Sequence, residues 1–307
     1  MIVIKLQGGL GNQLFQYALG RRLTSQGKDV AYDITSSYSW HKLRTYNLGH
    51  YNVNLVEAPR AEITKGEQEE YKRRTYGIIS RSMRYLKSKK ILRPDGFVSK
   101  MSDFVKSKLP KTYNIGYHPY VFDMTEGYLD GFWQSYKYID PIRDTLIKEI
   151  SLKEPLEKTH GDIIKKIKNS TSVSLHVRRG DYVSDPTTKQ VHFTFGIEYY
   201  EQALTIIKEK VPNAHIFVFS DDIPWAKENI KTEFPITFVS NPAIIKDYEE
   251  LILMSLCKHN IIANSSFSYW AGWLNQNPDK IVIAPLKWDN YYEKEHADLT
   301  PPSWIRI

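Results

Sequence analysis

The first 34 residues carry the pattern that most restricts the fold of this chain. Residues 2–6 are apolar, residues 8–13 (GGLGNQ) are rich in glycine, residues 14–26 repeat apolar side chains at helical spacing, and residues 30–34 (VAYDI) are apolar again. A strand, a loop, a helix and a strand in this order form a βαβ unit, which requires parallel strands joined by a crossover helix. The chain is therefore predicted to begin as a parallel α/β sheet.

A second alternating series follows a polar stretch near residues 151–160, which we interpret as a linker. Strands are predicted at 173–177, 215–219, 236–239, 261–263 and 281–284, and helices at 197–210, about 225–230, 247–257 and 266–275. The length of 307 residues suits two domains of about 150 residues each. We expect an α/β protein with two Rossmann-like domains, residues 1–155 and 156–307.

Composition excludes several classes of protein. With 41% apolar and 25% charged residues, the chain is neither disordered nor fibrous. The single cysteine, Cys257, cannot form an internal disulfide, a CxxC redox pair or a thiolate zinc site. No run approaches the roughly 18 to 20 apolar residues of a spanning helix, and the apolar run at the N-terminus is too short for a secretion signal. A cytoplasmic protein is expected, peripheral to a membrane at most.

The positive charge is concentrated in one segment. The formal net charge is +7, and residues 60–108 contain 14 basic and 6 acidic residues. This segment, which we expect to be mainly helical, suits either a solvated face or peripheral contact with an anionic membrane and its lipid-linked molecules. Few aromatic side chains interrupt it, so no nucleic-acid partner is expected.

The glycine-rich loop after the first predicted strand is a candidate binding element. Gly9 and Gly11 let a backbone approach a ligand closely, and the helix that follows directs its positive end toward the loop. A nicotinamide dinucleotide is one interpretation, although Leu14 stands where that motif needs a small residue. A tight turn without a ligand is another, but Asn12 and Gln13 have no function in a bare turn.

The string His176-Val177-Arg178-Arg179-Gly180-Asp181-Tyr182 lies at the end of a predicted strand. Guanidinium groups pair bidentately with phosphate oxygens, so the two arginines suit a diphosphate. Arg179 has the alternative of a salt bridge within the fold. Asp181 could orient an arginine or accept a proton, and His176, inside the strand, is either a hydrogen-bonded structural histidine or a catalytic or ligand-binding residue.

Two further strand ends carry polar side chains. Ser220, Asp221 and Asp222 follow the strand HIFVF, where they could bind a nucleoside, cap the next helix or hold Mg²⁺. Hydroxyl groups then surround the start of a later helix, where the unpaired N–H groups favour a phosphate over a simple serine cap. That candidate phosphate site consists of Asn264, Ser265, Ser266, Phe267 and Ser268.

Taken together, these motifs resemble the inverting α1,2-fucosyltransferases of glycosyltransferase family 11. The resemblance extends along nearly the whole chain, through GGLGNQLFQYALGRRL, GFWQSYKYI, HVRRGDY, FSDD and NSSFSYWAGWL in that order. Tyr269 stands where the family usually has tryptophan, and the basic middle region matches least well. A glycan-binding module without enzyme activity, an enzyme for another nucleotide sugar and a nicotinamide-dependent oxidoreductase are the alternatives.

The resemblance implies a GT-B fold, in which the two Rossmann-like domains face each other across a cleft. It implies GDP-fucose bound by the C-terminal domain, no metal ion or other cofactor, and a galactose-terminated oligosaccharide or lipid-linked glycan as acceptor, in O-antigen or similar synthesis. Arg178 would contact the β-phosphate, Ser265, Ser266 and Phe267 would form the phosphate cradle, and Asn12 would face the donor. Asp181 is the candidate base for inversion at the sugar.

Overall fold

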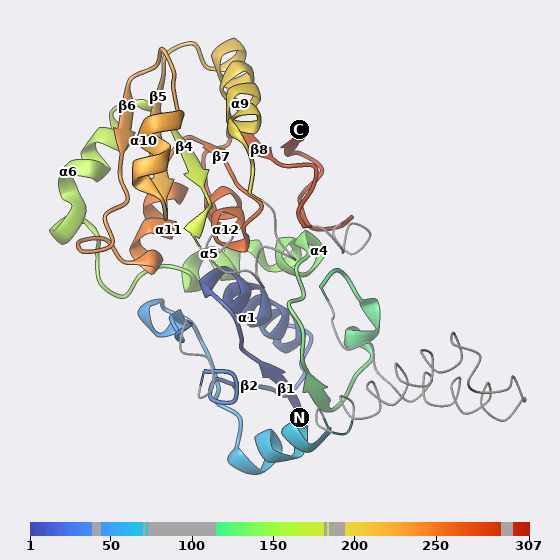
Figure 1. Ribbon diagram of the computed structural model, residues 1–307. Helices are drawn as coiled ribbons and strands as arrows, with labels where there is room; N and C mark the ends of the chain where they lie inside the picture. Colours follow the sequence, from blue (N-terminus) through green and yellow to red (C-terminus); the bar gives the residue numbers. More distant parts are fainter. Residues whose placement is uncertain (39–43, 70–71, 73–114, 181–182, 184–193, 290–296) are drawn as a thin grey trace, which may run out of the picture.

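The computed structural model describes residues 1–38, 44–69, 72, 115–180, 183, 194–289 and 297–307. Its two sheets consist of parallel strands, one sheet in each half of the chain (Figure 1). The N-terminal sheet has the order β2-β1-β3, with β1 at Ile2–Lys5, β2 at Val30–Asp33 and β3 at Gly127–Leu129. The predicted α/β fold with two Rossmann-like units is confirmed.

The C-terminal sheet has six strands in the order β6-β5-β4-β7-β8-β9. These are β4 (Thr171–Val177), β5 (Ala214–Ser220), β6 (Ile236–Phe238), β7 (His259–Ile261), β8 (Val282–Ala284) and β9 (Ile305–Arg306). Its helices are α6 (Glu157–Lys168), α9 (Ile197–Lys210), α10 (Ile223–Asn229), α11 (Asp247–Ser255) and α12 (Ser266–Leu274). The buried residues of β4 and β5 fit their interior positions in this sheet, where each strand pairs on both sides.

The N-terminal half contains α1 (Leu10–Thr24), the short α4 (Tyr136–Ile139) and α5 (Arg143–Glu149). Short 3-10 turns lie at Leu48–His50, Pro119–Phe122 and Asp140–Ile142, and residues 60–69 are helical. The rest of the basic segment 60–108, apart from residue 72, lies outside the described residues. None of the helices in the described ranges is long and apolar enough to cross a bilayer.

One predicted boundary in the first βαβ unit is wrong. Residues 8–13 were expected to be a loop, but α1 already begins at Leu10. Gly8 has a φ of +78°, which turns the chain sharply enough for Gly9 to cap the helix directly. Gly11 therefore lies inside the helix, where its lack of a side chain allows close packing against Ser266.

Helix α1 packs against α12 and joins the two halves (Figure 1). A Cβ atom on Gly11 would lie 2.3 Å from the backbone carbon of Ser266, and the indole N–H of Trp270 donates to the Gly11 carbonyl over 3.0 Å. The Phe15 ring packs 4.9 Å from Tyr269 and 5.1 Å from Trp270, centroid to centroid. One continuous hydrophobic core therefore includes residues of both sheets. The boundary at residue 155 stays a prediction.

Candidate functional site

The carboxyl ends of the two sheets are brought together at the start of α12. Asn12, in the first turn of α1, accepts hydrogen bonds from Ser266 Oγ and from Gln134 Nε2, each over 2.8 Å. Ser266 follows β7, Asn12 follows β1, and Gln134 follows β3. In parallel α/β sheets, ligands bind at this edge because loops and helix N-termini converge there.

Arg178 and Arg179 follow the end of β4 at this edge. Asp221, which follows β5, contacts the side chain of Arg178 and the backbone of Arg179. Arg178 Nη1 lies 2.7 Å from Asp221 Oδ2, and the backbone N–H of Arg179 donates to Asp221 Oδ1 over 2.8 Å. A Cβ atom at Gly180 would lie 2.6 Å from Asp221 Oδ2, so a larger residue there would displace this carboxylate. Asp221 thus fixes the loop that carries the candidate phosphate ligand. Asp181 lies outside the described residues.

Arg179 and Asp222 have structural roles. Arg179 Nε lies 3.3 Å from Asp222 Oδ2, and the guanidinium lies 4.1 Å from the ring centroid of Trp225. Asp222 also caps α10 by accepting from the backbone N–H of Trp225 over 3.1 Å. The predicted salt bridge of Arg179 and the predicted capping by Asp222 are both confirmed.

His176 is buried, with 3% of its surface exposed. Burial, and secondarily the charge of Arg178, lowers its pKa to about 3, so the imidazole is neutral near pH 7 and is not a source of protons. Its Nδ1 has no hydrogen-bond partner among the described residues, and its ring lies 5.7 Å from that of Phe267. His176 therefore connects β4 to the first turn of α12, while the expected hydrogen bond is missing at Nδ1.

The N-terminus of α12 receives no capping hydrogen bond from the side chain of its own cap residue. Ser265 occupies the cap position but its hydroxyl forms no capping bond. Ser268 Oγ bonds to the Ser265 carbonyl over 3.4 Å, and Asn264 Nδ2 donates to the carbonyl of Trp288 over 3.1 Å. The helix therefore leaves its positive end to other partners, which suits an anion. The alternative of a simple serine cap, which the sequence disfavours, is therefore not what Ser265 forms, and phosphate binding at this turn stays a prediction.

The remaining predicted residues mainly shape the loops. Gln13 is fully buried; its Nε2 donates to the carbonyls of Gly8 and Thr45, and its Oε1 accepts from the N–H of Asn47. The Ser220 hydroxyl accepts from the Asp222 N–H over 2.9 Å. Gly9 caps α1. Whether these residues or Gly11 contact a donor stays a prediction.

Sequence reasoning missed Gln134 and Glu250. Gln134 lies in the GFWQSYKYI string. The sequence pattern of this string shows no periodicity that would indicate what its side chains contact. Glu250, on α11, accepts from the Ser240 hydroxyl, which in turn accepts from the N–H of Ser220 over 2.8 Å. Burial raises the pKa of Glu250 to about 7, against the ordinary 4.5. A half-buried carboxyl group that titrates near neutrality thus lies behind the end of β5.

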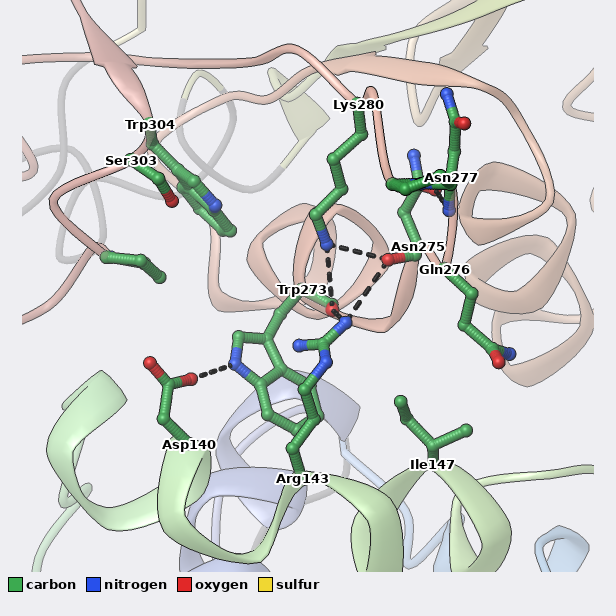
Figure 2. Close-up of a pocket in the computed structure, with 12 residues that line it drawn as sticks. Asp140, Arg143, Ile147, Trp273, Asn275, Gln276, Asn277, Lys280, Ser303 and Trp304 are labelled. Carbon is green, nitrogen blue, oxygen red and sulfur yellow. Dashed lines mark hydrogen bonds between the residues drawn. The ribbon is translucent and has the colours of Figure 1, made fainter.

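At the opposite end of α12 is a cavity of about 600 Å³ (Figure 2). Arg143 Nη2 donates to the carbonyl of Trp273 over 2.8 Å, and Lys280 Nζ donates to that of Asn275 over 2.6 Å. Burial lowers the pKa of Lys280 to about 8. These cations satisfy the last carbonyl groups of α12 and stabilise its negative end. Among the described residues, no cluster of three or more His, Cys, Asp or Glu side chains could hold a metal ion.

Comparisons with known proteins give consistent results. The model of the family described as "Glycosyl transferase family 11" matches residues 1–307. The chain is 32% identical to the O-antigen biosynthesis glycosyltransferase WbnK of Escherichia coli, over 98% of this chain and 99% of that protein. It is 28% identical to an α-1,2-colitosyltransferase of Escherichia coli, over 100% and 99% of the two chains. Human galactoside α-(1,2)-fucosyltransferase 1 is 25% identical, over 58% of this chain and 52% of that protein.

Proposed function

The chain belongs to glycosyltransferase family 11, and from this premise we propose that it transfers L-fucose from GDP-fucose to the 2-hydroxyl of a terminal galactoside. The product would carry an α1,2 linkage, and the acceptor would be an oligosaccharide or lipid-linked precursor of O-antigen or a similar surface polysaccharide. One relative is named for O-antigen biosynthesis and another for α-(1,2) transfer of fucose to galactosides. These names support the proposal.

The observation that carries the proposal is the position of Arg178 beside the uncapped start of α12. Arg178 follows β4 and Ser266 follows the end of β7, and β4 and β7 are paired neighbours in the sheet. A guanidinium and a helix N-terminus therefore lie on adjacent strand ends, the arrangement that suits a diphosphate. Phe267, whose ring contacts His176, belongs to the same turn.

This arrangement would stabilise the leaving group of the transfer. When the bond between fucose and GDP breaks, negative charge develops on the β-phosphate while the sugar becomes electron-poor. Donors that are already in place lower the barrier most, because they need no reorganisation during the reaction. The ion pair with Asp221 holds Arg178 in a fixed direction. We propose that this arginine and the first N–H groups of α12 stabilise the diphosphate without a metal ion.

A second candidate donor deserves a test because one relative is named an α-1,2-colitosyltransferase. Transfer of colitose, or of a sugar from another nucleotide, would use the same anion site with different sugar contacts.

A cytoplasmic location, and contact of residues 60–108 with a membrane surface, are further parts of the proposal.

Two measurements test the proposed function. In a thermal-shift panel of GDP, UDP, CDP and ADP, we expect GDP to stabilise the protein most, since a bound ligand raises stability by RT ln(1 + [L]/Kd). With GDP-fucose and a panel of galactosides, mass spectrometry should then detect a fucosylated product, and its formation should persist in EDTA. A preference for another nucleotide, turnover only with another sugar, or loss of turnover in EDTA would contradict the corresponding part of the proposal.

A further inference from the structure

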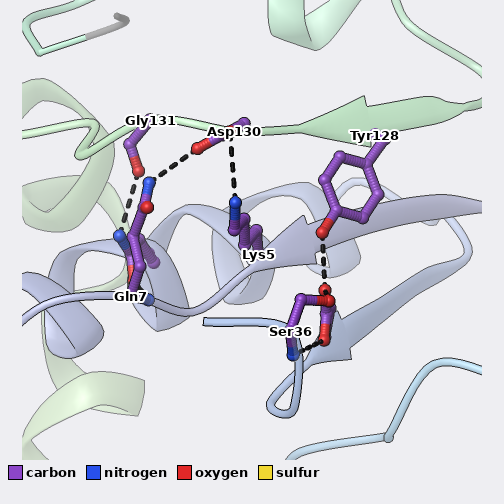
Figure 3. A network of polar contacts seen from close by, with 8 residues as sticks. Lys5, Gln7, Ser36, Tyr128, Asp130 and Gly131 are labelled. Atoms are coloured by element: carbon purple, nitrogen blue, oxygen red, sulfur yellow. Dashed lines mark hydrogen bonds and ion pairs between the residues drawn. The ribbon is translucent and has the colours of Figure 1, made fainter. Parts of the chain in front are cut away.

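Three polar side chains meet at the carboxyl end of the N-terminal sheet, whereas Arg178 follows a strand of the C-terminal sheet. Lys5 ends β1, Gln7 follows it, and Asp130 follows β3 (Figure 3). Lys5 Nζ lies 3.4 Å from Asp130 Oδ2, and Gln7 Nε2 donates to Asp130 Oδ1 over 2.6 Å. Each carboxylate oxygen therefore has its own donor, and both oxygens are fixed in direction.

Lys5 is an unusual residue for its strand. The other residues of β1 are apolar and buried, and Lys5 itself is only 7% exposed. A buried ammonium group is costly unless it is paired, so its pairing with Asp130 favours the ionised carboxylate. The Asp130 side chain nevertheless keeps 14% of its surface exposed. The sheet edge thus presents a fixed anionic group that solvent or a ligand can still reach.

The neighbouring carboxylate, Asp33, is not accessible to solvent or to a ligand. It is fully buried, and it accepts hydrogen bonds from the backbone N–H groups of Thr35 and Ser36, both over 3.0 Å, and from the Tyr128 hydroxyl over 2.5 Å. Asp33 therefore fixes the turn after β2. Of these two carboxylates at the edge of the N-terminal sheet, Asp130 is the one with accessible surface.

The loop after Asp130 is strained and leads to the donor side. Trp133 is fully buried, has a φ of +55°, and its indole N–H has no hydrogen-bond partner among the described residues. Such a backbone conformation is strained, and strained residues cluster at active sites and ligand clamps. The next residue, Gln134, bonds to Asn12, which bonds to Ser266 at the start of α12. Four residues of loop thus connect Asp130 to the proposed phosphate site.

We propose that Asp130 binds the attacking hydroxyl of the acceptor and receives its proton; this inference rests on the proposed function. Inversion requires the hydroxyl to approach from the face opposite the leaving group. The acceptor oxygen forms a bond to the anomeric carbon, the bond from that carbon to the diphosphate oxygen breaks with its electron pair leaving on GDP, and the hydroxyl proton moves to the Asp130 carboxylate. With the diphosphate bound by the C-terminal half, as proposed above, a base on the N-terminal half lies on the face of the sugar opposite the leaving group.

This assignment competes with Asp181, the base that the sequence predicts. Asp181 follows Arg178 by three positions, in the string that would bind the leaving group. A residue of that string suits the donor side better than the opposite face of the sugar. Variants of both residues therefore belong in one experiment.

The first test compares Asp130→Asn with the wild type and with Glu126→Gln, an exposed carboxylate near the other end of β3. Asparagine keeps the shape of aspartate but does not accept a proton. We expect transfer from GDP-fucose to a β-galactoside such as lactose to fall about 10²- to 10⁴-fold, the usual effect of removing a general base. GDP binding by thermal shift, and the slow hydrolysis of GDP-fucose without acceptor, should remain within about twofold of wild type. Glu126→Gln should leave all three unchanged.

The second test is a pH profile of kcat/KM for Lys5→Gln. A carboxylate that loses a neighbouring cation binds a proton more readily, so the acidic limb of the profile should move to higher pH when the Lys5 ammonium, 3.4 Å from Asp130, is removed. A purely structural role of the pair would reduce the rate without moving this limb.

Three results would overturn the inference. These are near-normal transfer by Asp130→Asn, a parallel loss of GDP binding and hydrolysis in that variant, or selective loss of transfer in Asp181→Asn alone. Failure of the proposed function looks different, because the wild-type protein itself would then not transfer fucose to any galactoside.

Discussion

Neighbouring arginines at the end of β4 have different environments, and this difference predicts different consequences of mutation. Arg178 pairs with Asp221 beside the start of α12, whereas Arg179 packs on Trp225 and pairs with the residue that caps α10. We expect Arg178→Ala to reduce turnover about 10²- to 10³-fold, since removal of one donor to a developing anion typically has this effect. The measurement is kcat/KM together with the thermal unfolding midpoint.

The matched control is Arg179→Ala. It should lower stability by about 1 kcal/mol through loss of the cation–π contact and ion pair, with a smaller effect on the rate of the folded protein. Equal losses of rate in both variants would show that the two guanidinium groups act together, contrary to the roles assigned here.

Glu250 makes the stability of the protein depend on pH. Its pKa is raised from 4.5 to about 7 in the folded state, chiefly by burial, so folding takes up a proton in this window. The wild type should therefore lose stability, on the order of 1–3 kcal/mol, as the pH rises from about 4.5 through 7. Glutamine resembles the protonated form, and Glu250→Gln should remove this loss. Urea unfolding of both proteins at pH 5 and pH 8 measures this loss of stability. The same pH dependence in both proteins would show that Glu250 is not its source.

The sequence indicates which polar side chains gather at the strand ends, but not what those side chains contact. The string from His176 to Asp181 and the serines around Phe267 stood out because several polar residues followed apolar runs. The partners of these residues were harder to predict. Asp221 was expected to contact a nucleoside, bind a metal ion or cap a helix, but a sequence does not reveal that a carboxylate will meet an arginine 43 positions earlier.

At the scale of elements, α1 and α12 carry the most constrained contact. Gly11→Ala would place a methyl group 2.3 Å from the backbone of Ser266, and backbone cannot move aside as a flexible side chain would. We expect a loss of about 1–3 kcal/mol in the free energy of unfolding, together with weaker GDP binding, because the start of α12 is displaced. Chemical unfolding and a GDP titration measure the two effects.

Gly161 in α6 is the control for this substitution, since a Cβ atom there has no neighbour within 4 Å. Gly161→Ala should be neutral or stabilise the protein by about 0.5–1 kcal/mol, as alanine is the better helix former. A tolerated Gly11→Ala variant with normal GDP affinity would show that the two helices can separate without consequence.

Elements with clear periodicity were predicted well, and the errors lie where tertiary contacts set the boundary. The helix at 197–210 matches α9, and the predicted strand 215–219 lies within β5. The start of α1 was placed four residues late because three glycines suggested a loop, whereas Gly8 alone makes the turn. Strand β3 was missed because it is only three residues long and lies in an aromatic-rich region without alternation.

At the scale of the molecule, the largest hydrophobic cluster of the described residues joins the two α/β units that the sequence predicts. The core includes β1 and α1 from the first unit and Tyr269, Trp270 and Trp273 from the second. Shared burial of this kind couples the stability of the two units, since neither can unfold without exposing apolar surface of the other. Periodicity alone does not reveal such coupling, because it identifies the buried face of a helix but not its partner.

This coupling predicts a single unfolding transition, and Arg143 offers a way to test it. Arg143, on α5, donates to the carbonyls of Trp273 and Asn275 over 2.8 and 3.2 Å, and its guanidinium lies 4.5 Å from the ring centroid of Trp273 (Figure 2). Arg143→Met should lower the free energy of unfolding by roughly 1–3 kcal/mol. Far-UV circular dichroism and tryptophan fluorescence should still give coincident curves.

Because Arg143 contacts the end of α12 opposite the proposed phosphate site, the stabilisation by GDP should be the same in wild type and Arg143→Met. Arg306→Met, which removes one exposed hydrogen bond to the carbonyl of Leu286, is the control and should change stability by less than about 0.5 kcal/mol. Two separate transitions in the wild type would mean that the shared core does not couple the halves. A smaller GDP shift in Arg143→Met would instead mean that the two ends of α12 are not independent.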